Sequence, residues 1–380
     1  MIIKNKIHIL LTSLIIVLLW FPGEAAQAED SSTNLVLVTL DGVRWQEVFG
    51  GVDQDLIADE RYTENPELMQ ETYGHEQREE RREKLFPFLW SVVATQGVII
   101  GDRTRESYME VTNPWWFSYP GYNEILTGSV DPDIDSNNKN WNSNITFLEV
   151  LNGMAGFQNS VMAFGSWDVF PYIFNTQRSG LPVNAGFDIA TNALTEKTVW
   201  LNEVSAEAPK LWKSVRVDFL THGYAMEALR SQHPRVMYVS YGETDDFAHD
   251  DSYDRYIDAA FRTDMMLSKL WHWLQSDPFY RGRTTLIIAT DHGRGTTPDG
   301  WPHHASIPGA VKLGFDNAPD GIPGSDQIWF AAIGPGIPAK GLLRGHWKQS
   351  QIAATALASL QLDPQAILPE ADRVMEQVLR

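Results

Sequence analysis

The sequence predicts an α/β fold, namely a three-layer αβα sandwich with a mostly parallel central sheet. Short runs of β-branched and aliphatic residues alternate with longer stretches of helical periodicity. Several of these short runs are continuously apolar, which is typical of strands that are covered on both faces. Strands that alternate with helices form mainly parallel sheets with a helix layer on each face.

The candidate strands are six short apolar runs at Asn34–Leu40, Gly97–Ile100, Ser160–Phe164, Arg235–Ser240, Thr284–Ala289 and Ile328–Ile333. Helical patterns lie between or after these runs, at Phe86–Thr95, Phe147–Asn152, Lys210–Gln232, Asp254–Gln275 and Gln349–Leu360. In such folds ligands bind beyond the carboxyl ends of the strands. We therefore expect the chemistry of this chain at that edge of the sheet.

The N-terminus has the three-part layout of a secretory signal peptide. A basic start, MIIKNK, precedes the apolar run IHILLTSLIIVLLWF and the small-residue stretch AAQA. We expect cleavage after Ala28 and export to the periplasm or the medium, with no membrane anchor left. The alternative is a transmembrane anchor, but the run is shorter than the roughly 20 apolar residues that a bilayer span needs.

The remaining residues, 29–380, are predicted to form a single domain with two surface insertions. Residues 51–85 are strongly charged, which indicates a solvated helical excursion. Residues 305–324 are rich in Gly and Pro and predict an irregular loop near the functional edge.

The composition excludes several classes of function. The formal net charge is −19, which argues against nucleic-acid backbones as partners because they require a basic surface. The absence of Cys rules out disulfides, thiolate nucleophiles and Cys-ligated zinc. Because the chain is acidic overall, a bound phosphate would need local positive charge from metal ions or from a few Arg and Lys side chains.

Residues of the kinds that ligate metals follow several candidate strands. They are Asp41 after the first strand, Asp245 and His249 after the fourth, Asp291 and His292 after the fifth, and His303 and His304 further on. An Asp in such a place is more commonly a helix cap or turn residue. The spacing of Asp245 and His249, however, would place both on one face of a helix, and Asp-His-Gly puts two ligand types at a strand end.

Carboxylate oxygens and imidazole nitrogens without thiolates suit zinc, and also manganese or iron. We therefore expect two divalent metal ions, with zinc as the first candidate. A pair of such ions can clamp the attacking and leaving oxygens of an in-line displacement.

A serine precedes a predicted helix in the segment Thr112–Gly128. Pro120 and Gly121 bend the chain after Ser118, and Tyr122–Leu126 can begin a helix. A serine in this place faces unpaired backbone N–H groups, which favour an anion such as phosphate. On its own, Ser118 could equally be a cap of that helix.

Taken in order, these motifs resemble the alkaline phosphatase superfamily, especially its phosphodiesterase and phosphatase branches. In that family an Asp follows the first strand, as Asp41 does. The nucleophile motif matches Ser-Tyr-Pro at 118–120 and Thr-Gly at 127–128, and the motifs Asp-x-x-x-His and Asp-His-Gly match 245–249 and 291–293. The resemblance covers most of residues 34–362.

The resemblance implies one metal ion held by Asp41, Ser118, Asp291 and His292. It implies a second ion held by Asp245, His249 and a later histidine, for which His304 fits best and His303 and His346 are rivals. It also implies an Asn that contacts the phosphoryl oxygens, with Asn137 as the first candidate and Asn138 as the second. Lys139, Arg178 and Arg44 are further candidates for substrate contacts.

The activity that the resemblance implies is an exported two-metal hydrolysis of phosphate mono- or diesters, through Ser118 and a phosphoserine intermediate. Its expected partner is a small-molecule phosphate ester, whose identity stays open, as does the oligomeric state. Sulfatases of the superfamily carry Cys or Ser followed by x-Pro-x-Arg, but Tyr122 stands here in place of the Arg. A sulfate-ester hydrolase is therefore a weaker alternative, and a catalytically inactive exported protein that binds metal or anions is another.

Overall fold

The computed structural model describes residues 33–192, 194–315 and 318–379. The predicted signal peptide, residues 1–28, lies outside the described residues. The described residues form one compact unit. Within the described part of the chain, no helix is long and apolar enough to cross a membrane.

Within these residues, eight strands form the central sheet, in the order β10-β2-β9-β7-β1-β6-β4-β5. They are β1 (Asn34–Leu40), β2 (Val98–Ile100), β4 (Val161–Gly165), β5 (Val183–Ala185), β6 (Val236–Tyr241), β7 (Thr284–Ala289), β9 (Phe330–Ile333) and β10 (Gly341–Leu342). Neighbouring strands are parallel, except that β9 runs antiparallel to β2 and β7. The mostly parallel sheet that the sequence predicts is confirmed.

The predicted strand Ile328–Ile333 divides between two sheets. β9 lies in the central sheet, whereas β8 (Gln327–Ile328) joins β3 (Ser107–Glu110) and β11 (Gly345–Lys348) in a small second sheet. The chain changes sheets at Trp329, whose buried indole Nε1 donates to the carbonyl oxygen of Val43 at 3.0 Å. A continuous apolar run does not reveal such a change.

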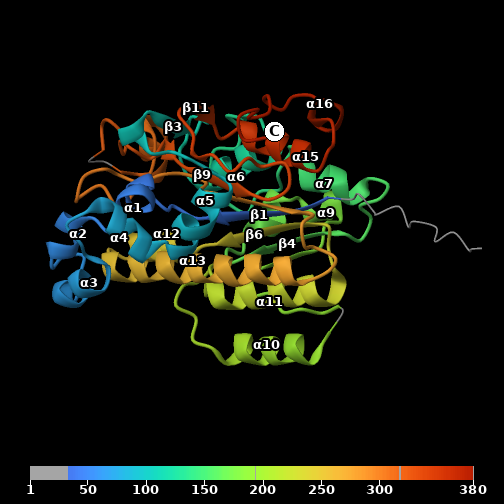
Figure 1. Cartoon of the computed structure of the whole chain (residues 1–380), viewed down its shortest axis with the longest axis horizontal. Coiled ribbons are helices and arrows are strands. Elements are labelled where there is room, and N and C mark those ends of the chain that lie inside the picture. The colour runs from blue at the N-terminus through green and yellow to red at the C-terminus, as the bar shows by residue number, and fades with distance from the viewer. Residues whose placement is uncertain (1–32, 193, 316–317, 380) are drawn as a thin grey trace, which may run out of the picture. The chain divides into compact units, whose positions relative to one another are not determined.

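Helices cover both faces of the sheet, so that the three-layer sandwich is also confirmed (Figure 1). One layer contains α11 (Asp218–Gln232) and α13 (Tyr253–Ser276), with α10 (Glu196–Glu207) packed outside α11. The other contains α6 (Ser118–Thr127), α7 (Phe147–Gly153) and α15 (Gln351–Ser359). The predicted helix at Lys210–Gln232 begins only at Asp218, because Val215 instead forms an isolated bridge with Trp167.

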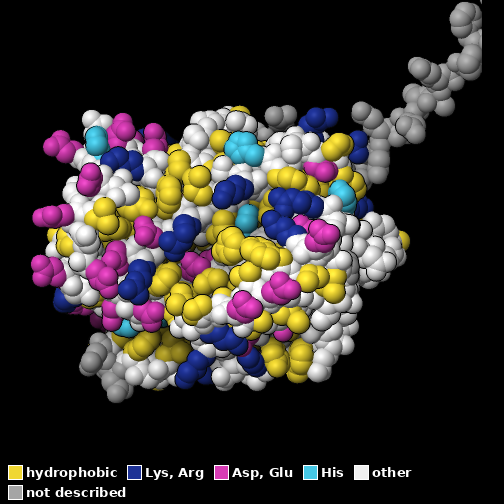
Figure 2. Space-filling view, turned by 90° about the horizontal axis from the view of Figure 1, so that it is seen from below, with side chains coloured by type: hydrophobic (Ala, Val, Ile, Leu, Met, Phe, Trp, Pro, Cys, Tyr) yellow, Lys and Arg dark blue, Asp and Glu magenta, His cyan; other side chains and the backbone are white. Residues whose placement is uncertain are grey.

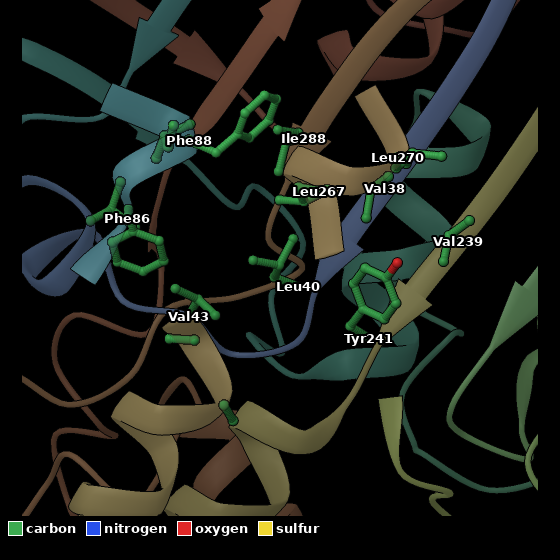
Figure 3. Packing of buried hydrophobic residues seen from close by; sticks show 14 of the residues in the cluster. Val38, Leu40, Val43, Phe86, Phe88, Val239, Tyr241, Leu267, Leu270 and Ile288 are labelled. Carbon is green, nitrogen blue, oxygen red and sulfur yellow. The ribbon is translucent and has the colours of Figure 1, made fainter. Parts of the chain in front are cut away.

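Alternate residues of β1 supply both cores. Val36, Val38 and Leu40 pack on the α13 side of the sheet, and Leu35 and Leu37 pack on the α6 side. Figure 3 shows Val38 and Leu40 with Leu267 and Leu270 of α13 in the first of these clusters. Burial on both faces explains why the strand is continuously apolar.

The charged insertion at 51–85 forms helices, as the sequence predicts. They are α2 (Gln54–Ala58), α3 (Pro66–Tyr73) and α4 (Arg78–Leu85), and they follow α1 (Trp45–Gly50). Figure 2 shows acidic side chains gathered at the left of the view, the end that carries α2 and α3. The predicted helix Phe86–Thr95 is instead a π-helical turn, η1 (Leu89–Val93), continued by α5 (Ala94–Gln96).

The prediction that 305–324 is an irregular loop is wrong in part, because this segment contains α14 (Ile307–Leu313). The Ser306 hydroxyl caps the helix by accepting from the Gly309 amide at 3.0 Å. Pro308 stands in its first turn and Gly314 ends it with a φ of 77°, so these two residues mark helix ends. The remaining short elements are η2 (Arg103–Arg105), α8 (Phe170–Ile173), α9 (Thr176–Ser179), α12 (Glu243–His249) and α16 (Pro364–Ile367).

Candidate metal centre and nucleophile

Three parallel neighbours, β6, β1 and β7, end at the same edge of the sheet and deliver the acidic and histidine side chains. Asp41 follows β1 directly, and Asp291 and His292 follow β7. Asp245 and His249 lie on α12, which begins two residues after β6 and stacks the two side chains one turn apart. The sheet thus brings residues from distant parts of the sequence to one place.

Ser118 lies at the same edge as the first residue of α6. It is buried, and its Oγ lies 3.2 Å from His292 Nε2. The N-cap of α6 is Phe117, so Ser118 is not the N-cap. Gly121 allows this approach, because a Cβ at that position would lie 2.4 Å from the carbonyl oxygen of Asp291.

The first cluster of polar atoms surrounds His292 Nε2. Asp291 Oδ2 lies 3.3 Å from this nitrogen and Asp41 Oδ1 lies 3.4 Å from it, so both are at nearly the same distance as Ser118 Oγ. Ligands bound tetrahedrally at about 2.0–2.1 Å from one ion lie about 3.3–3.4 Å from each other. The spacing of these atoms therefore fits one metal ion.

Each carboxylate of this cluster has one oxygen held and one oxygen free. The Tyr122 hydroxyl donates to Asp41 Oδ2 at 2.8 Å, and the Gly42 amide donates to Asp291 Oδ1 at 3.1 Å. Asp41 Oδ1 and Asp291 Oδ2 are buried and have no hydrogen-bond partner. Buried polar atoms are normally paired, so two unpaired oxygens beside one imidazole are what a cation site requires.

The second cluster contains Asp245, His249 and His304. His249 Nε2 lies 3.2 Å from Asp245 Oδ2 and 3.1 Å from His304 Nε2, and His304 Nε2 lies 3.6 Å from Asp245 Oδ1. The donor set is again carboxylate and imidazole. Asp245 Oδ1 also lies 3.9 Å from His292 Nε2, so the two clusters adjoin.

Backbone carbonyls orient two of the three imidazoles. His292 Nδ1 lies 2.9 Å from the carbonyl oxygen of Gly293, and His304 Nδ1 lies 3.2 Å from that of Trp116. Donation from Nδ1 leaves Nε2 of each ring available to a metal ion. Trp116 adopts a φ of 57°, a conformation that bulky residues rarely adopt, and its carbonyl meets His304 from this position.

The sequence reasoning missed one charged residue of the site, Arg294. Its guanidinium is fully buried, with Nη1 donating to Asp245 Oδ1 and Nη2 lying 3.4 Å from His249 Nδ1. A Cβ at Gly42 would lie 2.6 Å from Arg294 Nη1, so the Asp-Gly pair after β1 leaves room for this cation. The only signal in the sequence is that Arg294 lies three residues after the candidate ligand Asp291.

Solved structures of several enzymes share this architecture. An alkaline phosphatase, PafA, aligns with a TM-score of 0.56 and 10% identity over 92% of this chain and 99% of its own. A protein of the alkaline phosphatase superfamily from Vibrio parahaemolyticus gives 0.53 and 13% over 92% and 71%, and a 2-O glycosaminoglycan sulfatase, BT1596, gives 0.53 and 13% over 92% and 74%. This chain has the alkaline phosphatase superfamily fold. No family model matches the sequence, and no curated protein matches it.

Within this alkaline phosphatase fold, the structure distinguishes between the three histidines that could be the last ligand of the second ion. His304 lies in the second cluster, whereas His346 lies on β11 and stacks on Tyr108 with ring centroids 4.4 Å apart. His303 is half-buried beside Phe315, and its ring centroid lies 6.4 Å from that of His249. Geometry therefore favours His304 as the third member of the second cluster.

The structure also distinguishes between the residues that were candidates for phosphate contacts. Asn137 Oδ1 accepts from the Tyr119 amide at 2.9 Å, next to Ser118, whereas Asn138 is exposed. Three cations proposed from the sequence are engaged elsewhere: Arg44 is buried and paired with Glu47, Arg178 pairs with Glu149 at 2.8 Å, and Lys139 pairs with Asp168 at 2.7 Å.

The electrostatics of this candidate site reflect crowded carboxylates. Burial, and then the neighbouring Asp41, raise the pKa of Asp291 well above its ordinary value. Burial alone would lower the pKa of His292, but Asp291 and the other carboxylates outweigh burial and raise it to about 9. Burial would raise the pKa of Asp245, but His249 and Arg294 hold it well below its usual range. The first cluster thus has an excess of negative charge that cations would neutralise.

Proposed function

We propose that this chain is an exported, metal-dependent hydrolase that cleaves phosphate esters with Ser118 as the nucleophile. The observation that carries the proposal is the position of Ser118 Oγ, within 3.2 Å of an imidazole that two unpaired carboxylate oxygens also approach. Similarly folded proteins include a phosphatase and a sulfatase. Tyr122 favours phosphate over sulfate, because it stands where sulfatases have Arg and is hydrogen-bonded to Asp41.

The residues present fit two divalent ions, with zinc as the first candidate and manganese or iron as alternatives. Asp41, Ser118, Asp291 and His292 would hold one ion. Asp245, His249 and His304 would hold the other. When bound, such ions neutralise charge on the reacting oxygens and lower the pKa of a hydroxyl that they bind.

The chain itself positions the reacting groups. Ser118 loses its hydroxyl proton to solvent and its Oγ forms the new bond to phosphorus, while the ester oxygen leaves with its electron pair and takes a proton from water. A second water later attacks the phosphorus of the phosphoserine, which releases the phosphate product and returns a proton to Ser118 Oγ. Because Asn137 Oδ1 is held by the Tyr119 amide, its Nδ2 is left to donate to a phosphoryl oxygen. The helix amides contribute less than the sequence suggests, since Tyr119 N–H is used, Pro120 has none and Gly121 N–H bonds Phe117 at 3.0 Å.

The experiment that tests the proposal compares wild type with Ser118→Ala on an aryl phosphate, a bis-aryl phosphate and an aryl sulfate. We expect wild type to hydrolyse one of the phosphates, and the variant to lose roughly 1,000-fold or more in kcat. The ratio of the two phosphate rates separates monoesterase from diesterase activity. Turnover of the sulfate alone would contradict the proposal, and a metal-loaded protein without any turnover would favour the binding protein.

A second comparison tests Asn137 against its neighbour. Asn137→Ala should lower kcat/KM for the better phosphate by roughly 10–1,000-fold, the range for a donor aimed at developing charge. Asn138→Ala removes the same side chain one exposed position further on and should change the rate by less than about threefold. Equal losses in the two variants would remove Asn137 from the mechanism.

A further inference from the structure

The two candidate metal positions differ in the charge that surrounds them. The first has two carboxylates, Asp41 and Asp291, and their second oxygens are held by neutral donors, the Tyr122 hydroxyl and the Gly42 amide. The second has one carboxylate, Asp245, and its Oδ1 is held by the guanidinium of Arg294. The protein therefore contributes about two negative charges to the first position and roughly none to the second.

Arg294 cannot readily leave this place. Its side chain is fully buried, its Nε donates to the carbonyl oxygen of Trp301 at 2.9 Å, and its Nη2 donates to that of Pro302. These bonds hold the guanidinium on Asp245 and near His249. A fixed cation in a buried site acts on a neighbouring ion with little screening by water.

One histidine of the second position, His249, differs from the other two imidazoles. His292 and His304 direct Nδ1 at a backbone carbonyl, the kind of acceptor that makes a metal-binding imidazole more basic. His249 Nδ1 faces the Arg294 guanidinium, which can only donate. The His249 side chain is 38% exposed and that of Asp245 is 14% exposed, whereas Asp291 and His292 are fully buried.

We propose that Arg294 makes the two metal positions unequal. The position formed by Asp41, Ser118, Asp291 and His292 binds its ion tightly and retains it. The position formed by Asp245, His249 and His304 binds its ion weakly and exchanges it with solvent. The positive charge of Arg294 repels the ion, the His249 imidazole is less basic, and the position is more exposed, and each of these lowers the affinity. This inference rests on the proposed two-metal function and deepens it.

The test is a Zn²⁺ titration of metal-stripped protein by calorimetry, with the bound ions counted by native mass spectrometry. For wild type we expect two ions whose dissociation constants differ roughly 100-fold or more. Arg294→Gln should strengthen the weaker position by roughly tenfold or more and change the tighter one by less than about threefold. Arg294→Lys keeps the charge and should keep the positions unequal.

Arg262→Gln is the control for the loss of a nearby cation. Arg262 lies on α13, is half-exposed and bonds Glu243 of α12 at 3.3 Å, so its removal takes a cation from beside the helix that carries Asp245 but not from the metal position. It should leave both dissociation constants unchanged within about threefold. An equal strengthening of the second position by Arg262→Gln would overturn the role of Arg294.

A further variant assigns the weak position without changing Arg294. His249→Ala should abolish the weaker binding event and retain the tighter one. Loss of the tighter event instead, or two equal affinities in wild type, would overturn the proposal while leaving the two-metal hydrolase intact. Wild type that binds no ion would defeat the proposed function itself, so that the two failures are distinguishable.

Discussion

Tyr122 shows how one residue orders the centre. Its hydroxyl donates to Asp41 Oδ2 at 2.8 Å and accepts from Ser240 Oγ at 3.1 Å, and its ring packs edge-on against Phe170. The donation holds one carboxylate oxygen and leaves Asp41 Oδ1 directed at His292. Loss of a group that orients a metal ligand in this way typically weakens metal binding by about 10–100-fold.

Tyr122→Phe should therefore weaken Zn²⁺ binding at the tighter position by about 10–100-fold, and it should lower the free energy of unfolding by about 1–3 kcal/mol. Tyr280→Phe is the control, because Tyr280 is equally buried but donates to the Pro234 carbonyl away from the site. It should lose similar stability without any change in metal affinity. Calorimetric titration and urea unfolding measure the two quantities, and equal affinities in both variants would contradict the role of Tyr122.

The candidate ligands could be predicted at the residue scale because strand ends carry a local signal. Asp41, Asp291 and His292 directly follow apolar runs, and Asp245 and His249 have helical spacing. Arg294 and Tyr122 could not be assigned, because their roles depend on partners 49 and 81 residues away in sequence. The role of Trp116 could not be predicted for a similar reason, because its carbonyl oxygen orients His304, which is distant in sequence.

At the element scale, α12 reaches the site through reciprocal capping with α11. Asp218 Oδ1 accepts from the Gly242 amide at 2.8 Å and Oδ2 from that of Glu243 at 3.1 Å. Glu243 Oε1 accepts in return from the Asp218 amide at 2.7 Å. Each acidic side chain thus satisfies the N-terminus of the other helix, which fixes the helix that carries Asp245 and His249.

A second acidic cap, Asp264 of α13, should make the free energy of unfolding depend on pH. Its carboxylate accepts from the amides of Phe88 at 2.7 Å and Leu89 at 3.0 Å, and burial raises its pKa from 3.8 to about 7. Between these two values the unfolded chain has lost the proton while the folded chain retains it. The contribution of this residue to stability is therefore greatest at low pH and falls as the pH rises toward 7.

Asp264→Asn removes this titration while keeping an oxygen that can accept one amide. The difference in the free energy of unfolding, wild type minus variant, should fall between pH 4 and 7 by at most about 1.4 kcal/mol per pH unit and level off above pH 7. Urea unfolding at several pH values measures it. A difference that stays constant across this range, or that rises with pH, would show that the carboxyl is not held protonated in the folded chain.

Across the whole molecule, the layers were predictable from sequence and the direction of one strand was not. Continuous apolar runs indicate strands covered on both faces, and β1 supplies both cores as that pattern requires. The reversal of β9 leaves no trace in its apolar residues, because hydrophobicity records burial and not direction. The short strands of the second sheet were missed because runs of two to four residues carry too little pattern.

The candidate centre brings together parts of the chain that are far apart in sequence, so metal removal should affect the stability of the whole molecule. Its candidate ligands follow β1 and β7 and lie on α6, on α12 and in the segment before α14. With the ions removed, the buried carboxylates of Asp41 and Asp291 would repel each other, and an ion at about 1,000 times its dissociation constant stabilises by about 4 kcal/mol. Chelation should therefore lower the melting temperature of the metal-loaded protein by roughly 5–10 °C, as measured by calorimetry. Asp291→Asn removes a ligand of the tighter position and should be nearly insensitive to chelator. If the variant loses as much stability on chelation as wild type does, the stabilising ion does not bind at the end of β7.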